Sequence, residues 1–167
     1  MIDPLQMFYA EAEATIPAFN SFADKHSLSG LTKADHICYK CSSKESFENI
    51  RTMLESQSEY MYQSIISKRR IAYIKMKKGI KTTLGTIFFL ELSDQKPDGS
   101  QFEGFDHIEV YPTSFSYNEM VGELEKSEKV IKVERPHHTT HDVELENGFI
   151  FRCTAEQLIE KIKLTEM

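Results

Sequence analysis

The tripeptide Asp-His-Ile occurs twice in this chain, and its two histidines are the residues best placed to carry chemistry. The first copy is Asp35-His36-Ile37 and the second is Asp106-His107-Ile108, each in a short run typical of a strand. A repeat in matching contexts indicates that one supersecondary unit is used twice. If the two units pack together, His36 and His107 can converge. Two imidazoles meeting inside a barrel are the beginning of a metal site.

The predicted elements that position these histidines also repeat. Strands of the first unit are expected at residues 36–41, 60–66, 70–76 and 83–92. Strands of the second unit are expected at residues 105–111, 130–133, 139–145 and 149–153, with Asn147-Gly148 as a hairpin turn. In each unit a helix is predicted after the first strand, so both units read as βαβββ.

Capping residues mark the predicted helices. Ser42 with Glu45, and Ser116 with Glu119, form capping boxes ahead of the two internal helices. An opening helix is expected over residues 3–27, where Asp3 and Pro4 suit its start. A closing helix is expected to begin near residue 154.

The sequence therefore predicts an α+β fold in which two βαβββ modules form an open, barrel-like sheet around a cavity, with an added helix at each end. The expected organisation is a helical extension (1–30), a first module (31–93), a linker (94–104) and a second module with the closing helix (105–167). All four parts are expected to make one structural domain.

Strand alternation gives the histidines polar neighbours. His36 shares a strand face with Cys38 and Lys40, and His107 shares one with Glu109 and Tyr111. Glu91 ends an apolar strand, and a buried carboxylate must be paired, hydrogen-bonded or metal-bound. Two histidines and one carboxylate leave open positions on a first-row divalent metal.

With paired βαβββ units, a histidine near each first strand and Glu91 on a fourth strand, the chain resembles the vicinal oxygen chelate superfamily. That group includes glyoxalase I, extradiol dioxygenases and resistance proteins of the fosfomycin and bleomycin type. Within it, the chain is most similar to the YecM family, a group expected to bind metal. The matching stretches are residues 34–37, 69–75, 91–92 and 103–109.

This resemblance implies that His36, Glu91 and His107 ligate one divalent ion, with Fe, Mn, Zn and Ni all compatible. Relatives often place a fourth ligand on the last strand, where this chain has Arg152. The departure favours a three-ligand site, or one adapted to an anion held by Arg152. Glu109 is the candidate general base beside the metal.

Plainer interpretations stand beside these. The two histidines can satisfy each other across the interface, and Glu91 can pair with Arg152 or Lys40. Other residues could line the cavity or lie elsewhere: Cys38, His137, His138, His141, Arg69, Arg70, Arg135, Tyr73 and Phe89. The run Cys38 to Cys41 looks like a zinc knuckle, but residues three apart on a strand face opposite ways.

Composition limits the function classes. The net charge of −6 argues against nucleic-acid binding, because there is no basic surplus to neutralise phosphates. A signal peptide or an apolar run long enough for a membrane span is not expected. Three cysteines without framework spacing suggest a reducing, cytoplasmic compartment.

Three hypotheses follow for the function. The first is a metal-dependent isomerase, lyase or oxygenase that acts on a small oxygen-chelating, anionic substrate. The second is a non-catalytic protein that binds or sequesters a small molecule in the same cavity. The third is a protein-interaction domain whose histidines and carboxylates satisfy one another. Oligomeric state is left open.

Overall fold

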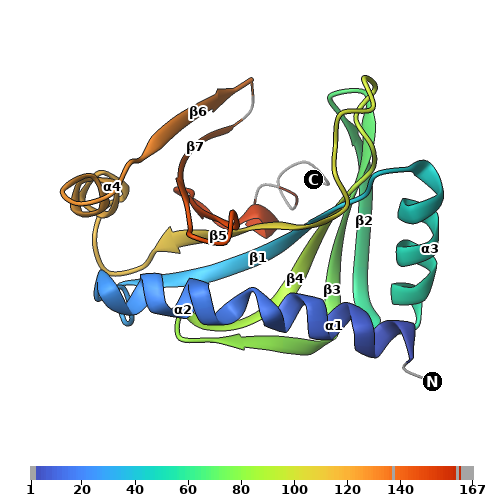
Figure 1. Ribbon diagram of the computed structural model, residues 1–167, viewed down its shortest axis with the longest axis horizontal. Helices are drawn as coiled ribbons and strands as arrows, with labels where there is room; N and C mark the ends of the chain where they lie inside the picture. The colour runs from blue at the N-terminus through green and yellow to red at the C-terminus, as the bar shows by residue number, and fades with distance from the viewer. Residues whose placement is uncertain (1–2, 137, 161, 163–167) are drawn as a thin grey trace.

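The structure, a computed structural model, describes residues 3–136, 138–160 and 162 (Figure 1). The strands are β1 (Thr32–Lys40), β2 (Ser58–Ile66), β3 (Arg69–Thr82), β4 (Gly85–Ser93), β5 (Gly104–Pro112), β6 (Ile131–Arg135), β7 (His138–Glu144) and β8 (Ile150–Cys153). The helices are α1 (Pro4–Ala14), α2 (Ile16–Lys25), α3 (Lys44–Glu55) and α4 (Tyr117–Glu125).

All these strands form a single open sheet in the order β2-β3-β4-β1-β5-β8-β7-β6. Along the chain, β1-α3-β2-β3-β4 is followed by β5-α4-β6-β7-β8, so the βαβββ order occurs twice. In each half the first strand runs parallel to the last, β1 with β4 and β5 with β8. The α+β class and the open, barrel-like sheet expected from the sequence are confirmed.

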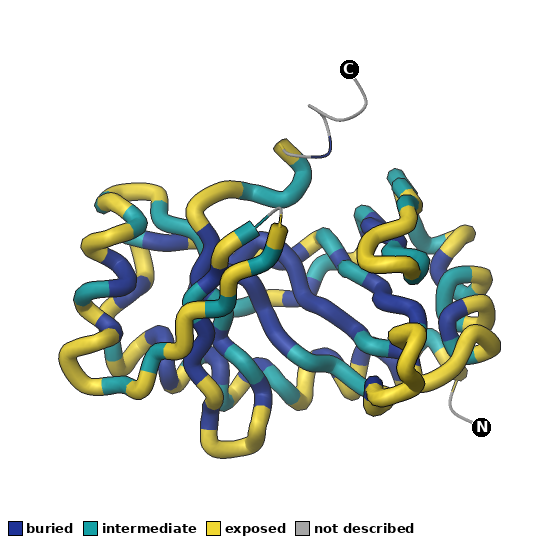
Figure 2. Tube along the Cα trace, turned by 90° about the horizontal axis from the view of Figure 1, so that it is seen from above, coloured by how far each residue is buried: buried dark blue, intermediate teal, exposed yellow. Residues whose placement is uncertain are grey.

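The antiparallel pair β1–β5 joins the two halves in the middle of the sheet. Ile37 pairs with Ile108 at the centre of this seam, with His36 opposite Glu109 and Cys38 opposite His107. The two Asp-His-Ile motifs are thereby brought side by side in opposite directions. Figure 2 shows the tube as mostly buried through these central strands, while many of the surrounding loops and helix surfaces are exposed.

Apolar packing covers the outer face of the seam. Helices α1 and α2 run across the sheet on this side (Figure 1). The Phe8 ring lies 5.4 Å from that of Tyr39 and 5.0 Å from that of Phe105, while Phe19 stacks on Phe151 at 5.4 Å. Because strand side chains alternate, His36 and His107 are directed to the other, inner face of the curved sheet.

Two local predictions were wrong. The opening helix is broken at Thr15 into α1 and α2, because Pro17 has no N–H to donate to the carbonyl of Glu13. The first internal helix is capped by Ser43 rather than Ser42, one residue later than expected. The second capping box, of Ser116 and Glu119, is confirmed.

The C-terminal end is described only in part. Residues 158–160 and 162 are helical, and the remainder of the expected closing helix lies outside the described residues. Within the described ranges, every helix is too short or too polar to cross a membrane.

Glu103 fastens the linker between the halves to the start of the first module. Its carboxylate accepts hydrogen bonds from the Tyr39 hydroxyl at 2.7 Å, the Ser42 amide at 2.7 Å and the Ser46 hydroxyl at 2.6 Å. Partial burial opposes ionisation, but these hydrogen bonds outweigh it and hold the pKa of Glu103 below its usual value of 4.5.

We therefore expect Glu103→Gln to lower the free energy of unfolding by about 1 kcal/mol near neutral pH, since the group is partly exposed. A carboxylate with a lowered pKa stabilises the fold above pH 4.5 and loses that contribution as the pH falls. The deficit of the variant should thus shrink toward about pH 3 in urea titrations. An equal deficit at both pH values would contradict this account, and Glu144→Gln on an exposed site is the control.

Candidate functional site

Four side chains meet on the inner face of the central strands. They are His36 on β1, Glu91 on β4, and His107 and Glu109 on β5; one nitrogen or oxygen atom from each lies within 4.8 Å of the others. These strands are neighbours in the order β4-β1-β5. The structure thus brings together the three residues expected as ligands, and adds the carboxylate that was expected as a general base.

A β-bulge beside each histidine shapes the cluster. The β1–β5 register skips Asp35 on one strand and Asp106 on the other, so each aspartate of the repeated motif is the extra, unpaired residue. The bulge lets the Asp35 carboxylate reach Nδ1 of His36 at 2.7 Å, and Asp106 reach Nδ1 of His107 at 2.7 Å. Both rings are therefore oriented with Nε2 toward the cluster.

The Nε2 atom of His36 lies at the centre of the charges. It is 2.9 Å from Oε2 of Glu109 and 3.3 Å from Oε2 of Glu91, and the histidine is fully buried. Among the described residues this nitrogen nevertheless has no partner with hydrogen-bond geometry. A buried nitrogen facing two carboxylate oxygens without a well-formed hydrogen bond is in a position suited to share a cation with them.

Electrostatics tie the protonation of the cluster together. Burial disfavours the imidazolium, yet the charge of Glu109 and the hydrogen bond to Asp35 prevail and raise the pKa of His36 well above 6.5. Burial likewise opposes ionisation of Glu91, but His36 overrides it and lowers the pKa of Glu91 to about 2. The same imidazole holds the pKa of Glu109 well below its usual value, against the effect of burial. Without a cation, a proton on His36 balances the two carboxylates.

Arg152 stands in the second half where Glu91 stands in the first. Cys38 pairs with Glu91 across β1 and β4, and Glu109 pairs with Arg152 across β5 and β8. Arg152 forms a two-pronged contact with Asp142, both at 3.0 Å, and places a nitrogen 3.1 Å from Nε2 of His107. The second half therefore presents its carboxylate from β5, as Glu109, rather than from β8.

Some of the residues left open reach the cluster. The Sγ atom of Cys38 lies 3.6 Å from Oε1 of Glu91, and Nε2 of His138 lies 3.1 Å from Oε1 of Glu109. Tyr73 stacks on Phe89 with ring centroids 4.9 Å apart, and lies edge-on to His36 at 5.7 Å. These side chains extend the inner face around the four central groups.

Other residues that the sequence analysis left open form contacts outside the cluster. His141 pairs with the Tyr117 hydroxyl at 2.6 Å, Arg69 contacts Gln101 and Arg70 binds Asp94. Lys40 pairs with Asp106 at 3.2 Å, so Lys40 and Arg152 both have carboxylates other than Glu91. Cys41 packs in the apolar core. His137 lies outside the described residues.

Arg135 makes its hydrogen bond outside the four-residue cluster. It donates to Oγ1 of Thr140 at 2.8 Å, and burial together with the charge of Arg152 lowers its pKa. The charges of Asp142 and Glu109 act in the opposite direction on this pKa.

Sequence reasoning missed the roles of Asp35, Asp106 and Asp142. The aspartates before the histidines did carry a signal, because both copies of the motif contain one. In a regular strand, however, adjacent residues face opposite ways, so the Asp-His contact becomes possible only with the bulges. No comparable signal marked Asp142, which meets Arg152 through β7–β8 pairing.

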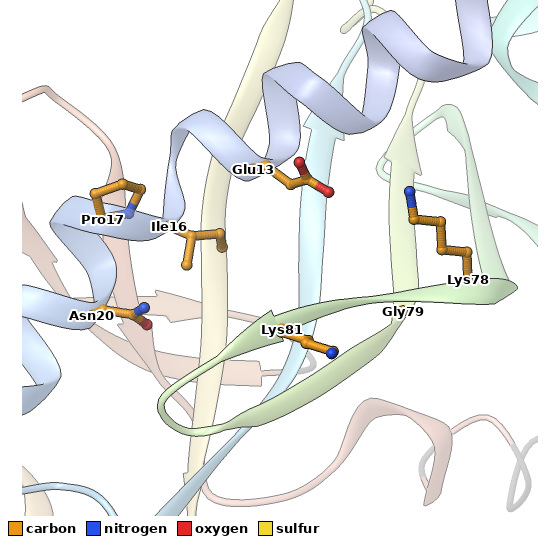
Figure 3. A pocket seen from close by; sticks show the side chains of 7 residues that line it. All are labelled: Glu13, Ile16, Pro17, Asn20, Lys78, Gly79 and Lys81. Atoms are coloured by element: carbon orange, nitrogen blue, oxygen red, sulfur yellow. The ribbon is translucent and has the colours of Figure 1, made fainter.

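A separate pocket of about 370 Å³ lies between helices α1 and α2 and the β3–β4 hairpin (Figure 3). Its lining residues are Glu13, Ile16, Pro17, Asn20, Lys78, Gly79 and Lys81. It contains none of the four cluster residues, and its charges are those of surface side chains. The chemistry available to this chain therefore centres on the cluster and not on this pocket.

The donor set fits a divalent cation. Two imidazoles held by aspartates, with two carboxylates, match the ligands found around first-row transition metals. The Nε2 atom of His36 supports such a fit, because it faces oxygens of Glu91 and Glu109 without a well-formed hydrogen bond among the described residues. His36, Glu91 and Glu109 can also move protons, because the pKa of His36 is raised while the pKa values of the two glutamates are lowered.

The proton balance leads to a test on metal-free protein. Glu109→Gln removes the negative charge that favours the imidazolium, so the pKa of His36 should fall. Nitrogen chemical shifts of the ring, followed by NMR against pH, report the titration directly. Glu128→Gln, which removes a carboxylate paired with Lys25, should leave the His36 midpoint unchanged. An unmoved midpoint in Glu109→Gln would rule out the charge coupling.

Comparisons with known proteins support the fold. A structure described as "Structural Genomics, Protein EC4020" has a TM-score of 0.70 and 22% identity, over 99% of this chain and 94% of that chain. A "putative dioxygenase from Bacillus subtilis subsp. subtilis str. 168" has a TM-score of 0.48 and 10% identity, over 75% of this chain and 41% of that chain. A glyoxalase I mutant from Zea mays has a TM-score of 0.28 and 14% identity, over 81% of this chain and 48% of that chain.

The last two TM-scores are too low to carry any argument, so the first of these three structures alone supports the fold, and no curated protein matches. The family model described as "YecM protein" matches residues 5–158, which is nearly the whole length. The chain belongs to the YecM family.

Proposed function

We propose that this protein is a divalent-metal-dependent enzyme of the vicinal oxygen chelate type. His36, Glu91 and His107 would hold the ion, and Glu109 would lie beside it. The observation that carries the proposal is the buried cluster itself, in which four potential donor atoms lie within 4.8 Å of one another at the seam of two βαβββ units. The paired Asp35 and Asp106 support it by orienting both imidazoles.

The chain's own residues would prepare the site for an oxygen-chelating substrate. When bound, the metal supplies Lewis acidity, or redox chemistry if it is iron. Imidazole and carboxylate donors suit Fe, Mn, Zn and Ni. Arg152, anchored on Asp142, would neutralise an anionic group. Glu91 has the most exposed side chain of the four, at 20%, which gives the cluster an opening.

Glu109 has two candidate roles, and they can be separated. As a general base it would accept a proton from the substrate, which its ionised state permits. As a fourth ligand it would take the role of the ligand that relatives often have on the last strand, where this chain has Arg152 on β8. Glu109→Gln with retained metal but lost activity supports the base, whereas lost metal supports the ligand.

A second candidate is a non-catalytic protein that binds a small molecule in the same cavity. The contact between Arg152 and Nε2 of His107 favours this candidate. Arg152 brings a positive charge to the cluster, so its carboxylates can be partly balanced without a metal ion. We also propose a reducing, cytoplasmic location and a small-molecule partner; the three buried free cysteines support the former.

Metal content tests the main proposal. Protein purified untagged and without chelators should hold about one ion per chain, measured by mass spectrometry. His36→Ala and Glu91→Gln should lose most of it while keeping the fold, checked by circular dichroism. Glu103→Gln, a carboxylate outside the cluster, is the matched control. If the wild type takes up no Fe, Mn, Zn or Ni after reloading, the binding protein becomes the better hypothesis.

Metal affinity should also depend on pH in a defined direction. An imidazole must lose its Nε2 proton before that atom can coordinate a metal, and the pKa of His36 is raised in the metal-free protein. Affinity should therefore increase by up to about tenfold per pH unit until the pH exceeds that pKa. Competition with a chromogenic chelator from about pH 6 to about pH 8 measures the slope. A flat profile would mean that His36 does not coordinate through this nitrogen.

A further inference from the structure

The hydroxyl of Tyr73 is a buried polar group that the fold leaves unused. Tyr73 is only 2% exposed, and its hydroxyl has no hydrogen-bond partner among the described residues. Such a group loses its hydration without compensation, which is unfavourable in a folded protein. The ring alone accounts for the packing, because it stacks on Phe89 with an angle of 2° between the planes. Phenylalanine would pack equally well and would avoid the penalty.

The position of Tyr73 in the sheet connects it with the cluster. Tyr73 pairs with Glu91 across β3 and β4, and Glu91 pairs with Cys38 across β4 and β1. Cross-strand partners present their side chains on the same face, so Tyr73 lies in the same row as Glu91. Its ring also meets the edge of His36. Tyr73 thus borders the cluster on the side of the first half, whereas Arg152 on β8 borders it on the other side.

The chemistry of the phenol decides which role it can play. A tyrosine hydroxyl ordinarily keeps its proton near neutral pH, because its usual pKa is about 10. A phenol that stays protonated beside carboxylates can donate a hydrogen bond but is a poor base. What it lacks is an acceptor among the described residues, and an oxygen of a bound ligand would supply one.

From this geometry we infer that Tyr73 donates a hydrogen bond to an oxygen of a small anion that chelates the metal through two oxygens. The assignment rests on the proposed metal site and names a contact within it: Tyr73 would hold one end of the ligand while Arg152 neutralises the other. The hydroxyl would then be satisfied only when the ligand is bound. This makes Tyr73 a ligand-binding residue that discriminates in favour of oxygen-bearing anions.

The test uses full-length protein loaded with zinc, and oxalate as the probe for a two-oxygen chelating anion. Tyr73→Phe should bind zinc as the wild type does, but should bind oxalate roughly ten- to a hundredfold more weakly by calorimetry. Tyr117→Phe is the matched control, because its hydroxyl is already engaged by His141 and donates to the Cys153 carbonyl. That control should leave both zinc and oxalate affinities unchanged.

Thermal unfolding of the metal-free variants gives an independent readout. Tyr73→Phe should keep or raise the melting temperature, since it removes an unsatisfied group, whereas Tyr117→Phe should lower it. A lowered melting temperature for Tyr73→Phe would mean that the hydroxyl has a structural partner, which overturns the assignment. Equal oxalate affinity in wild type and Tyr73→Phe, or none in either, also overturns it while the metal site stands. Failure of the wild type to bind zinc would instead remove the proposed function and this inference together.

Discussion

The antiparallel pairing of β1 with β5 is the interaction on which the rest of this structure depends. It joins the two βαβββ halves, and its register sets His36 against Glu109 and Cys38 against His107. A shift of one residue would turn both histidines into the apolar layer beneath α1 and α2. The packing of Ile37, Ile108 and the phenylalanines of those helices opposes such a shift. The hydrophobic effect on one face thus determines the chemistry on the other.

The two bulges in this seam place hydrogen-bond acceptors behind the histidines. Asp35 and Asp106 would face away from their histidines in a regular ladder, but as extra residues they contact Nδ1 of each ring. Asp35 also accepts a hydrogen bond from the amide of Leu158, which ties the C-terminal segment to the site. A feature that resembles an irregularity of the sheet therefore orients the groups on which binding depends.

The two halves share a fold but not a charge pattern. Position by position, Cys38 and Glu91 in the first half correspond to Glu109 and Arg152 in the second. Each half contributes one carboxylate to the cluster, Glu91 from β4 and Glu109 from β5. The second half also contributes the positive charge of Arg152, which has no counterpart in the first half. One side of the site therefore carries the positive charge of Arg152, and the other side carries the aromatic rings of Tyr73 and Phe89. A ligand bound between them would have unlike ends.

Much of the fold could be predicted from the sequence, because apolar alternation and turn residues are local signals. The repeated Asp-His-Ile motif, the isolated Glu91 and the strand face shared by His107 and Glu109 also marked the four clustered residues. The register of β1 with β5, the bulges, and the contacts of Asp142 and His138 could not be predicted in this way. They depend on pairings between distant segments, where many alternatives differ little in local preference. The break at Thr15 has a local cause in Pro17, which the prediction of one continuous helix over residues 3–27 did not take into account.

The sequence by itself determined the repeated βαβββ order, the apolar and polar faces of its strands, and the histidines and carboxylates that those faces present. Only the tertiary structure decided that Glu109 lies against Nε2 of His36, that Arg152 binds Asp142, and that the Tyr73 hydroxyl has no hydrogen-bond partner among the described residues. The physical reason is that composition and periodicity act over a few residues. Charge pairing and desolvation act instead between side chains that meet only after the sheet has closed around them.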